Sequence, residues 1–318
     1  MADCHDILIA FEEAISLNKS RCEKLEKSRD ALRKKIRKYC EDNGIEPLPT
    51  FKGQGSFTMG IANNSTKGSF DLDDGIYFEV EDANEMPTPK TIHGWIVEAV
   101  DGHTQQPVID KNTCVRVTFT DEDNPHHIDL PIYYHAKGDD HPHLAHKRDG
   151  WIESDPVEFA DWFAAECGDG DQLRRIVRYV KAWKDYKGVQ RPKSFVMTTL
   201  CALHFAKDDR DDVGLFETLK NIRTALGKEF SCLRPTTPLD EELLTDMDED
   251  AQERFLEALD CFIENAEYAI NSDLQTDACK YWKRSLGNVF PCDMASEDSD
   301  ATKRMAAPAF VKTEGRSA

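Results

Sequence analysis

The fold is decided by a strand-like stretch with the sequence FDLDDGIYF, at residues 70–78. Asp71 and Asp73 are two residues apart in it and alternate with the apolar residues Phe70 and Leu72. Side chains two residues apart on a strand point to the same face, so both carboxylates can project together while the apolar side chains pack underneath. The stretch therefore predicts a strand that presents a pair of acidic groups on one face.

A third carboxylate is expected beside this pair. Residues 114–119 and 127–133 have the pattern of strands, and Asp129 lies within the second of them. Three carboxylates at one point repel each other unless cations lie among them, and hard oxygen ligands select Mg²⁺ or Mn²⁺. Such sites bind phosphates. The alternative, a solvated acidic turn, is disfavoured because such turns rarely lie between apolar strands.

A glycine-rich turn precedes the acidic pair, at residues 53–60. Its glycines let backbone N–H groups approach an anion closely, and a helix that opens at Ser56 would direct its positive end towards a triphosphate. The Ser56 hydroxyl would add one more donor. A surface loop explains such a turn equally well when it is taken alone, but together with the three aspartates it predicts a nucleotide site.

These motifs resemble the polymerase-β-like nucleotidyltransferase superfamily. Within it they resemble the bacterial CD-NTases, relatives of cyclic GMP-AMP synthase that make cyclic oligonucleotide signals in anti-phage defence. The resemblance covers about residues 1 to 290. It implies that Asp71, Asp73 and Asp129 hold two magnesium ions, which manganese can replace, and act as the catalytic residues. It also implies that Gly55 and Ser56 bind the donor triphosphate.

The same resemblance implies roles for three residues further along the chain. Lys181 and Ser194 match a lysine and a helix-opening serine that bind the donor triphosphate, and Phe195 matches an aromatic residue that stacks on a base. The alternatives are a solvated lysine and a plain core phenylalanine. The chain departs from the family where Ile61 replaces a usual threonine, and where residues 63–69 form a longer stretch than usual.

The expected fold is α+β, with a polymerase-β-like nucleotidyltransferase core of mixed sheet and helices. The expected domains are a catalytic lobe at residues 1–150, a helical lobe that closes the nucleotide pocket at 151–290 and a flexible tail at 291–318. Apolar residues at helical spacing predict one long helix over residues 5–41 that braces both lobes. The acid-rich run at 236–250 is typical of a surface loop.

Charge and composition narrow the function further. Forty Lys and Arg residues oppose sixty Asp and Glu residues, a formal net charge of −20, which favours mononucleotide substrates over tRNA or a DNA template. No run of membrane-spanning length and no signal-peptide pattern occurs, so we expect a cytoplasmic protein without a membrane partner. Ten cysteines without a Cys-x-x-Cys pair indicate reduced thiols.

Four histidines at residues 135, 141, 143 and 146 form a local cluster that could bind a metal. The segment has loop-forming residues and no cysteine ligand nearby, so a zinc site is disfavoured. His127 is expected on the same strand face as Asp129. A half-exposed strand histidine is the favoured interpretation there.

Together with these motifs, the resemblance to the CD-NTases implies a Mg²⁺-dependent nucleotidyltransferase that condenses ATP, GTP or both into a cyclic di- or trinucleotide and releases pyrophosphate. A downstream effector would read the product. One alternative is transfer to another acceptor, an aminoglycoside or tRNA, and another is a catalytically inactive nucleotide-binding regulator. The small residues at 314–318 also make the C-terminus a candidate for conjugation to a target.

Overall fold

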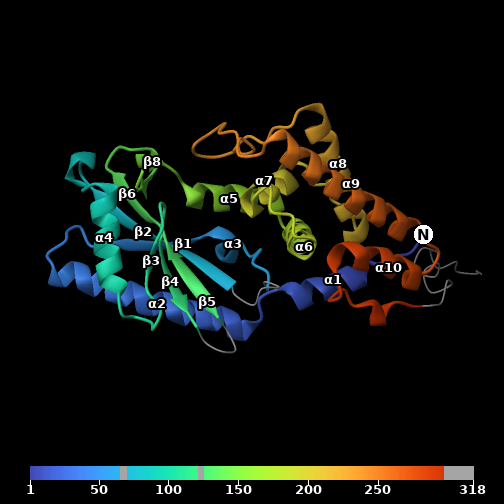
Figure 1. Ribbon diagram of the computed structural model, residues 1–318, viewed down its shortest axis with the longest axis horizontal. Helices are drawn as coiled ribbons and strands as arrows, with labels where there is room; N and C mark the ends of the chain where they lie inside the picture. The colour runs from blue at the N-terminus through green and yellow to red at the C-terminus, as the bar shows by residue number, and fades with distance from the viewer. Residues whose placement is uncertain (65–69, 121–124, 297–318) are drawn as a thin grey trace, which may run out of the picture.

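The computed structural model describes residues 1–64, 70–120 and 125–296, and these form a mixed α/β lobe and a helical lobe (Figure 1). The first lobe contains an eight-stranded sheet in the order β3-β4-β5-β2-β6-β7-β8, with β1 paired to β2. This confirms the predicted α+β architecture with a nucleotidyltransferase-like core and a C-terminal helical lobe.

Strand β2 (Phe70–Val80) is the centre of the sheet. Strand β5 (His126–Leu130) pairs parallel with its first part, and β6 (Ile132–Ala136) pairs parallel with its second part. Strand β1 (Thr50–Gln54) runs antiparallel to its middle. The remaining strands are β3 (Ile109–Asp110), β4 (Val115–Phe119), β7 (His143–His146) and β8 (Gly150–Glu153).

Two helices, α2 (Lys19–Asp42) and α4 (Pro89–Val100), share one hydrophobic core with the sheet. Leu25, Leu32 and Ile36 lie at helical spacing on α2 and are fully buried in this core. Burial of each such side chain stabilises the fold by about 1.5–3 kcal/mol. The core therefore holds β2 rigidly beneath its two acidic side chains.

The predicted single helix over residues 5–41 is wrong, because the chain breaks it into α1 (His5–Ile15) and α2. Ser16 is extended, and the Asn18 side chain accepts a hydrogen bond from the Arg21 N–H to start α2. Asn64 donates its backbone N–H to Ile15 O and its side-chain amide to Ser16 O. Asn64 thus supplies hydrogen-bond partners for the two backbone carbonyls at the break between the helices.

The break separates the two cores. Helix α1 packs in the helical lobe, with α6 and α8, whereas α2 packs in the α/β lobe (Figure 1). The two helices together therefore still connect both lobes, as predicted for one continuous helix.

The helical lobe is built on long amphipathic helices around one apolar core. Trp183 stacks on Phe262 with ring centroids 5.1 Å apart, and Trp282 is fully buried in the same core. The helices are α5 (Pro156–Cys167), α6 (Gln172–Lys187), α7 (Ser194–Leu203), α8 (Asp211–Lys228), α9 (Glu249–Asn271) and α10 (Gln275–Leu286).

Two further segments differ from the sequence-based expectation. Residues 143–146, expected in a loop, form β7, because Tyr134 and Tyr133 of β6 supply its pairing partners. After Pro291 the chain still forms a 3-10 helix, η2 (Cys292–Met294), and the Ser296 N–H donates to the Gln275 side chain. The rest of the predicted tail, including the candidate conjugation site at 314–318, lies outside the described residues.

The described cysteines are all free thiols. Within the described ranges, no helix is both long enough and apolar enough to span a bilayer.

Candidate active site

The three predicted catalytic carboxylates lie on one face of two neighbouring strands. Asp71 and Asp73 are two residues apart on β2, and the parallel register places Asp129 of β5 directly beside Asp73. His127 stands beside Asp71 in the same register. Because the pairing is in register, residues 56 positions apart in the sequence become adjacent on the sheet surface.

The electrostatics of Asp73 reflect this crowding. Burial, followed by the charges of Asp71 and Asp129, raises its pKa to about 7. A cation placed among the three groups would remove this penalty. The donor set of carboxylate oxygens suits a hard divalent cation such as Mg²⁺.

Asp129 differs from the other two because cationic side chains already hold it. Arg116 donates from Nε and Nη2 to its two oxygens, both at 2.6 Å, and Lys111 Nζ lies 3.3 Å away. Burial acts to raise the pKa of Asp129, but the Arg116 hydrogen bonds outweigh it and the pKa lies below its usual range. A metal ion that uses Asp129 must therefore share it with Arg116.

His127 of β5 pairs with Asp71 of β2 and lies two residues before Asp129. Its Nε2 lies 3.9 Å from Asp71 Oδ2, and burial lowers its pKa. A neutral imidazole at this position adds no charge to the acidic cluster.

The glycine-rich turn is built as the sequence predicts. A short helix, α3 (Gly55–Thr58), begins directly after β1, with Ser56 in its first turn. Gly55 has φ +70°, and a Cβ on it would lie 2.1 Å from Asp73 Oδ2. Only glycine tolerates both the backbone angle and this close approach. Gly55 thus couples the turn to the Asp73 carboxylate.

A cavity of about 450 Å³ lies between the lobes at this turn, a volume typical of small-molecule sites. It collects predicted site residues from both halves of the chain; Asp129 pairs with Asp73 in the sheet register but does not line the cavity. The predicted residues that line it are Gly55, Ser56, Asp71, Asp73, Lys181, Ser194 and Phe195.

Lys181 is a partly buried cation at the wall of this cavity. Its Nζ donates to the backbone oxygen of Ile61 at 2.8 Å. Burial lowers its pKa to about 8, and the negative charge of Asp71 opposes that shift. A lysine held in this way is positioned to receive an anionic ligand.

Phe195 lies in an aromatic corner of the cavity. Its ring centroid is 4.4 Å from that of Phe159, and the guanidinium of Arg234 lies 4.8 Å over its ring. Phe159 and Arg234 also line the cavity, and neither was among the residues predicted from the sequence motifs. The available signal for Arg234 was a single cation just before an acid-rich run, which is weak because such residues are common on surfaces.

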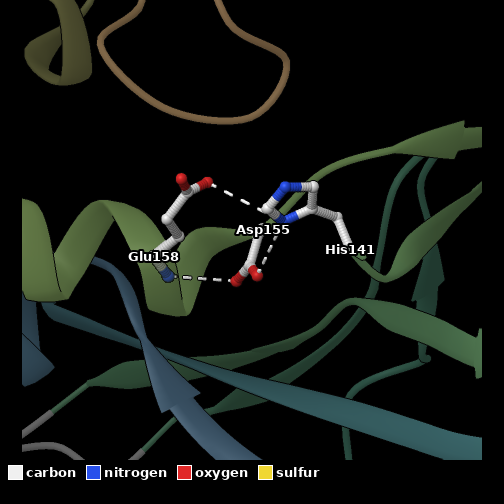
Figure 2. A group of neighbouring side chains, drawn as sticks. All are labelled: His141, Asp155 and Glu158. Carbon is white, nitrogen blue, oxygen red and sulfur yellow. Dashed lines mark hydrogen bonds and ion pairs between the residues drawn. The ribbon is translucent and has the colours of Figure 1, made fainter. Parts of the chain in front are cut away.

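A group of three side chains joins the lobes close to this corner (Figure 2). His141 Nδ1 lies 3.5 Å from Asp155 Oδ2 and 4.0 Å from Glu158 Oε2. The other Asp155 oxygen caps α5 by accepting from Val157 and Glu158 N–H groups, and Glu158 Oε2 accepts from the Thr237 N–H at 2.8 Å. The hydrogen bond from Thr237 to Glu158 ties α5 to the segment that carries Arg234.

The histidines at 135–146 do not converge on a common point. Each of the other three pairs with a different carboxylate: His135 with Glu79, His143 with Asp139 and His146 with Asp149. Among the described residues, His141, Asp155 and Glu158 are the one set of three whose ligand atoms all lie within 4.8 Å of one another. Asp71, Asp73 and Asp129 do not form such a set in this structure.

Comparison with known proteins places these residues in a family context. The model of the nucleotidyltransferase domain of DncV-like cyclic GMP-AMP synthases matches residues 49–133, which contain the glycine-rich turn and all three aspartates. The chain is 29% identical to a cyclic GMP-AMP synthase of Escherichia albertii over 199 residues, which are 58% of this chain and 42% of that protein. It is 28% identical to a cyclic GMP-AMP synthase of Vibrio cholerae over 251 residues, which are 60% and 55%.

The chain thus spans about half the length of these two curated relatives. Solved structures of Vibrio cholerae DncV share the fold over nearly the whole chain. A mutant in complex with ATP and GTP, among other ligands, has a TM-score of 0.79 at 18% identity, covering 93% of this chain and 99% of that one. A complex with the linear intermediate 5′ pppA(3′,5′)pG has a TM-score of 0.75 at 21% identity, covering 93% and 99%.

Proposed function

Because the chain belongs to the CD-NTase family, we propose that it condenses ATP and GTP into a cyclic dinucleotide and releases pyrophosphate. The observation that carries the proposal is the in-register placement of Asp71, Asp73 and Asp129 beside a cavity lined by Ser56, Lys181 and Ser194. Solved relatives hold ATP, GTP and a linear dinucleotide, which are the substrates and the intermediate of such a reaction.

The carboxylates are the proposed ligands of two Mg²⁺ ions, for which Mn²⁺ can substitute. Asp71 and Asp73 would hold both ions. Asp129 would bind one of these ions in addition to its hydrogen bonds from Arg116. Bound divalent cations would neutralise the triphosphate and make a ribose hydroxyl more acidic. The raised pKa of Asp73, caused first by its burial, supports the fit of a cation at this point.

The remaining groups position the substrates. The N–H groups of the turn at Gly55 and the Ser56 hydroxyl would donate to the donor triphosphate, and Lys181 and Ser194 would bind it from the helical lobe. The in-line attack of the acceptor hydroxyl on the α-phosphate then needs little more than alignment and charge neutralisation. Asp129, with its oxygens oriented by Arg116, is the proposed acceptor of the hydroxyl proton.

A cyclic product requires two such transfers in one pocket, with the linear dinucleotide turned round between them. We further propose that the product is an intracellular signal in anti-phage defence that a separate effector reads. Binding of nucleotides in the cytoplasm fits the strongly acidic net charge, which disfavours stable nucleic-acid binding.

The decisive experiment incubates the protein with all four NTPs and Mg²⁺ and identifies products by mass spectrometry. We expect a phosphatase-resistant cyclic dinucleotide and pyrophosphate from the wild type. The double variant Asp71→Asn, Asp73→Asn should give neither while its circular dichroism spectrum stays unchanged. Undiminished turnover in this variant would refute the assignment of the carboxylates.

The same assay separates the alternatives. Products that form only when an aminoglycoside or tRNA is added would identify a different acceptor. Tight nucleotide binding without turnover under Mg²⁺ and Mn²⁺ would identify an inactive regulator. Either result would overturn the proposed cyclase.

A further inference from the structure

The segment at residues 231–247 is a pre-shaped wall of the nucleotide cavity, although its acidic composition predicts an ordinary surface loop. The Arg234 N–H donates to Glu241 O, and the Asp240 N–H donates back to Arg234 O. Glu242 accepts hydrogen bonds from Ser231 Oγ and from the Cys232 N–H. These bonds close the segment on itself, so the position of its side chains is fixed before any ligand binds.

The segment is also fastened to the cavity from outside. The Thr237 N–H donates to Glu158 Oε2 at 2.8 Å, which ties it to the first turn of α5. Asp246 pairs with Arg191 and Lys193, just before the start of α7. Because α5 supplies Phe159 and α7 supplies Phe195, the segment is attached to both elements that form the aromatic corner.

The side chain of Arg234 is oriented by two contacts. Its Nε donates to Glu241 Oε2 at 2.6 Å, and its guanidinium lies over the Phe195 ring. In the part of the chain that the structure describes, its two terminal Nη atoms make no hydrogen bond. With Nε occupied, the two terminal NH₂ groups are left as a pair of adjacent donors at the cavity that Arg234 lines.

This placement favours a base over a phosphate as the partner of Arg234. The residues proposed to bind the phosphates are polar: Ser56 of the turn, Lys181 of α6 and Ser194 at the start of α7. Arg234 instead lies with the aromatic rings, on which bases stack. Two adjacent donors complement the O6 and N7 acceptors of guanine, whereas adenine presents a donor next to N7.

We propose that Arg234 is a specificity-determining residue that binds the O6/N7 edge of a guanine nucleotide and selects it over adenine at this end of the cavity. The proposal rests on the proposed function in so far as the cavity binds nucleotides. It does not depend on which product forms.

The test measures binding by isothermal titration with Ca²⁺ in place of Mg²⁺, so that turnover does not interfere. The probes are GTP, ATP and 7-deaza-GTP, which lacks the N7 acceptor. The wild type should bind GTP about tenfold more tightly than 7-deaza-GTP, as expected for the loss of half of a bidentate contact. In Arg234→Ala this preference should vanish, while the Kd for ATP changes less than about threefold.

Two further variants make the result specific. Arg234→Lys keeps a positive charge over Phe195 but lacks the fork, so it should also lose the preference for GTP over 7-deaza-GTP. Arg223→Ala removes an arginine of the same kind, paired with Asp260 on the surface of the helical lobe, and should leave all three affinities unchanged.

Three outcomes would overturn the proposal: no preference of the wild type for GTP over 7-deaza-GTP, a preference that survives in Arg234→Ala, or an equal loss of ATP and GTP affinity, which would indicate a phosphate contact. A wild type that binds nucleotides with this preference but makes no cyclic product would refute the proposed function alone. Absence of any nucleotide binding would refute both.

Discussion

Replacing Asp73 with asparagine should stabilise the protein while it abolishes catalysis. The pKa of Asp73 lies at about 7 in the folded protein instead of 3.8, because the group is buried next to two other carboxylates. Ionising it in the folded state therefore costs up to about 4 kcal/mol. Relaxation and water reduce such penalties, so we expect asparagine to recover about 1–3 kcal/mol at pH 8.

The sign of the pH dependence follows from the same shift. Between about pH 4 and pH 7 the folded protein holds a proton on Asp73 that the unfolded chain has lost, so this group lowers stability as the pH rises through that window. An asparagine side chain at this position would carry no titratable proton. The stability difference between variant and wild type should thus be smaller at pH 5 than at pH 8.

The assay is urea unfolding of wild type and Asp73→Asn in EDTA at pH 5 and pH 8. Asp169→Asn, at an exposed position between α5 and α6, is the matched control and should change stability by less than about 0.5 kcal/mol at both pH values. Added Mg²⁺ should stabilise the wild type and not Asp73→Asn. A variant that is no more stable at pH 8, or equally more stable at pH 5, would refute the idea that Asp73 is destabilised by its neighbours.

Three other substitutions test the turn, Lys181 and the contact between helices. Gly55→Ala should cost roughly 2 kcal/mol in urea unfolding and abolish turnover, because φ is +70° and its Cβ would lie 2.1 Å from Asp73 Oδ2. Lys181→Met should raise the KM for ATP about tenfold. Wild-type affinity should fall as the pH rises above about 8, where Lys181 loses its proton, and the variant should lack this dependence. Asp211→Ala should cost about 3–5 kcal/mol, because it leaves Arg175 of α6 without its bidentate partner; a loss below about 1 kcal/mol would contradict this.

The candidate site was predictable where its signal is local. The spacing of Asp71 and Asp73 and the glycine-rich turn both depend on the geometry of a few consecutive residues, which strand and helix periodicity specify. The apolar spacing of the helices in the second half of the chain was predictive for the same reason. The apolar spacing over residues 5–41 did not reveal the interruption at Ser16. Residues of a distant segment, Asn63 and Asn64, stabilise the extended backbone there.

The histidine segment failed as a prediction for a related reason. Residues 143–146 have the composition of a loop but become a strand, since β6 offers its edge for pairing. Pairing energy comes from the neighbouring strand and not from the segment itself. Propensity alone could not identify it.

By itself, the sequence determined that this protein has a strand with two acidic groups on one face, a glycine turn before it and a helical second half. Only the tertiary structure decided that Arg116 holds Asp129 and that Arg234 closes the aromatic corner of the cavity. The physical reason is that hydrogen bonds and charge pairs between distant segments depend on register and docking. Those are set by the packing of the whole chain, whereas strand and helix patterns repeat within a few residues.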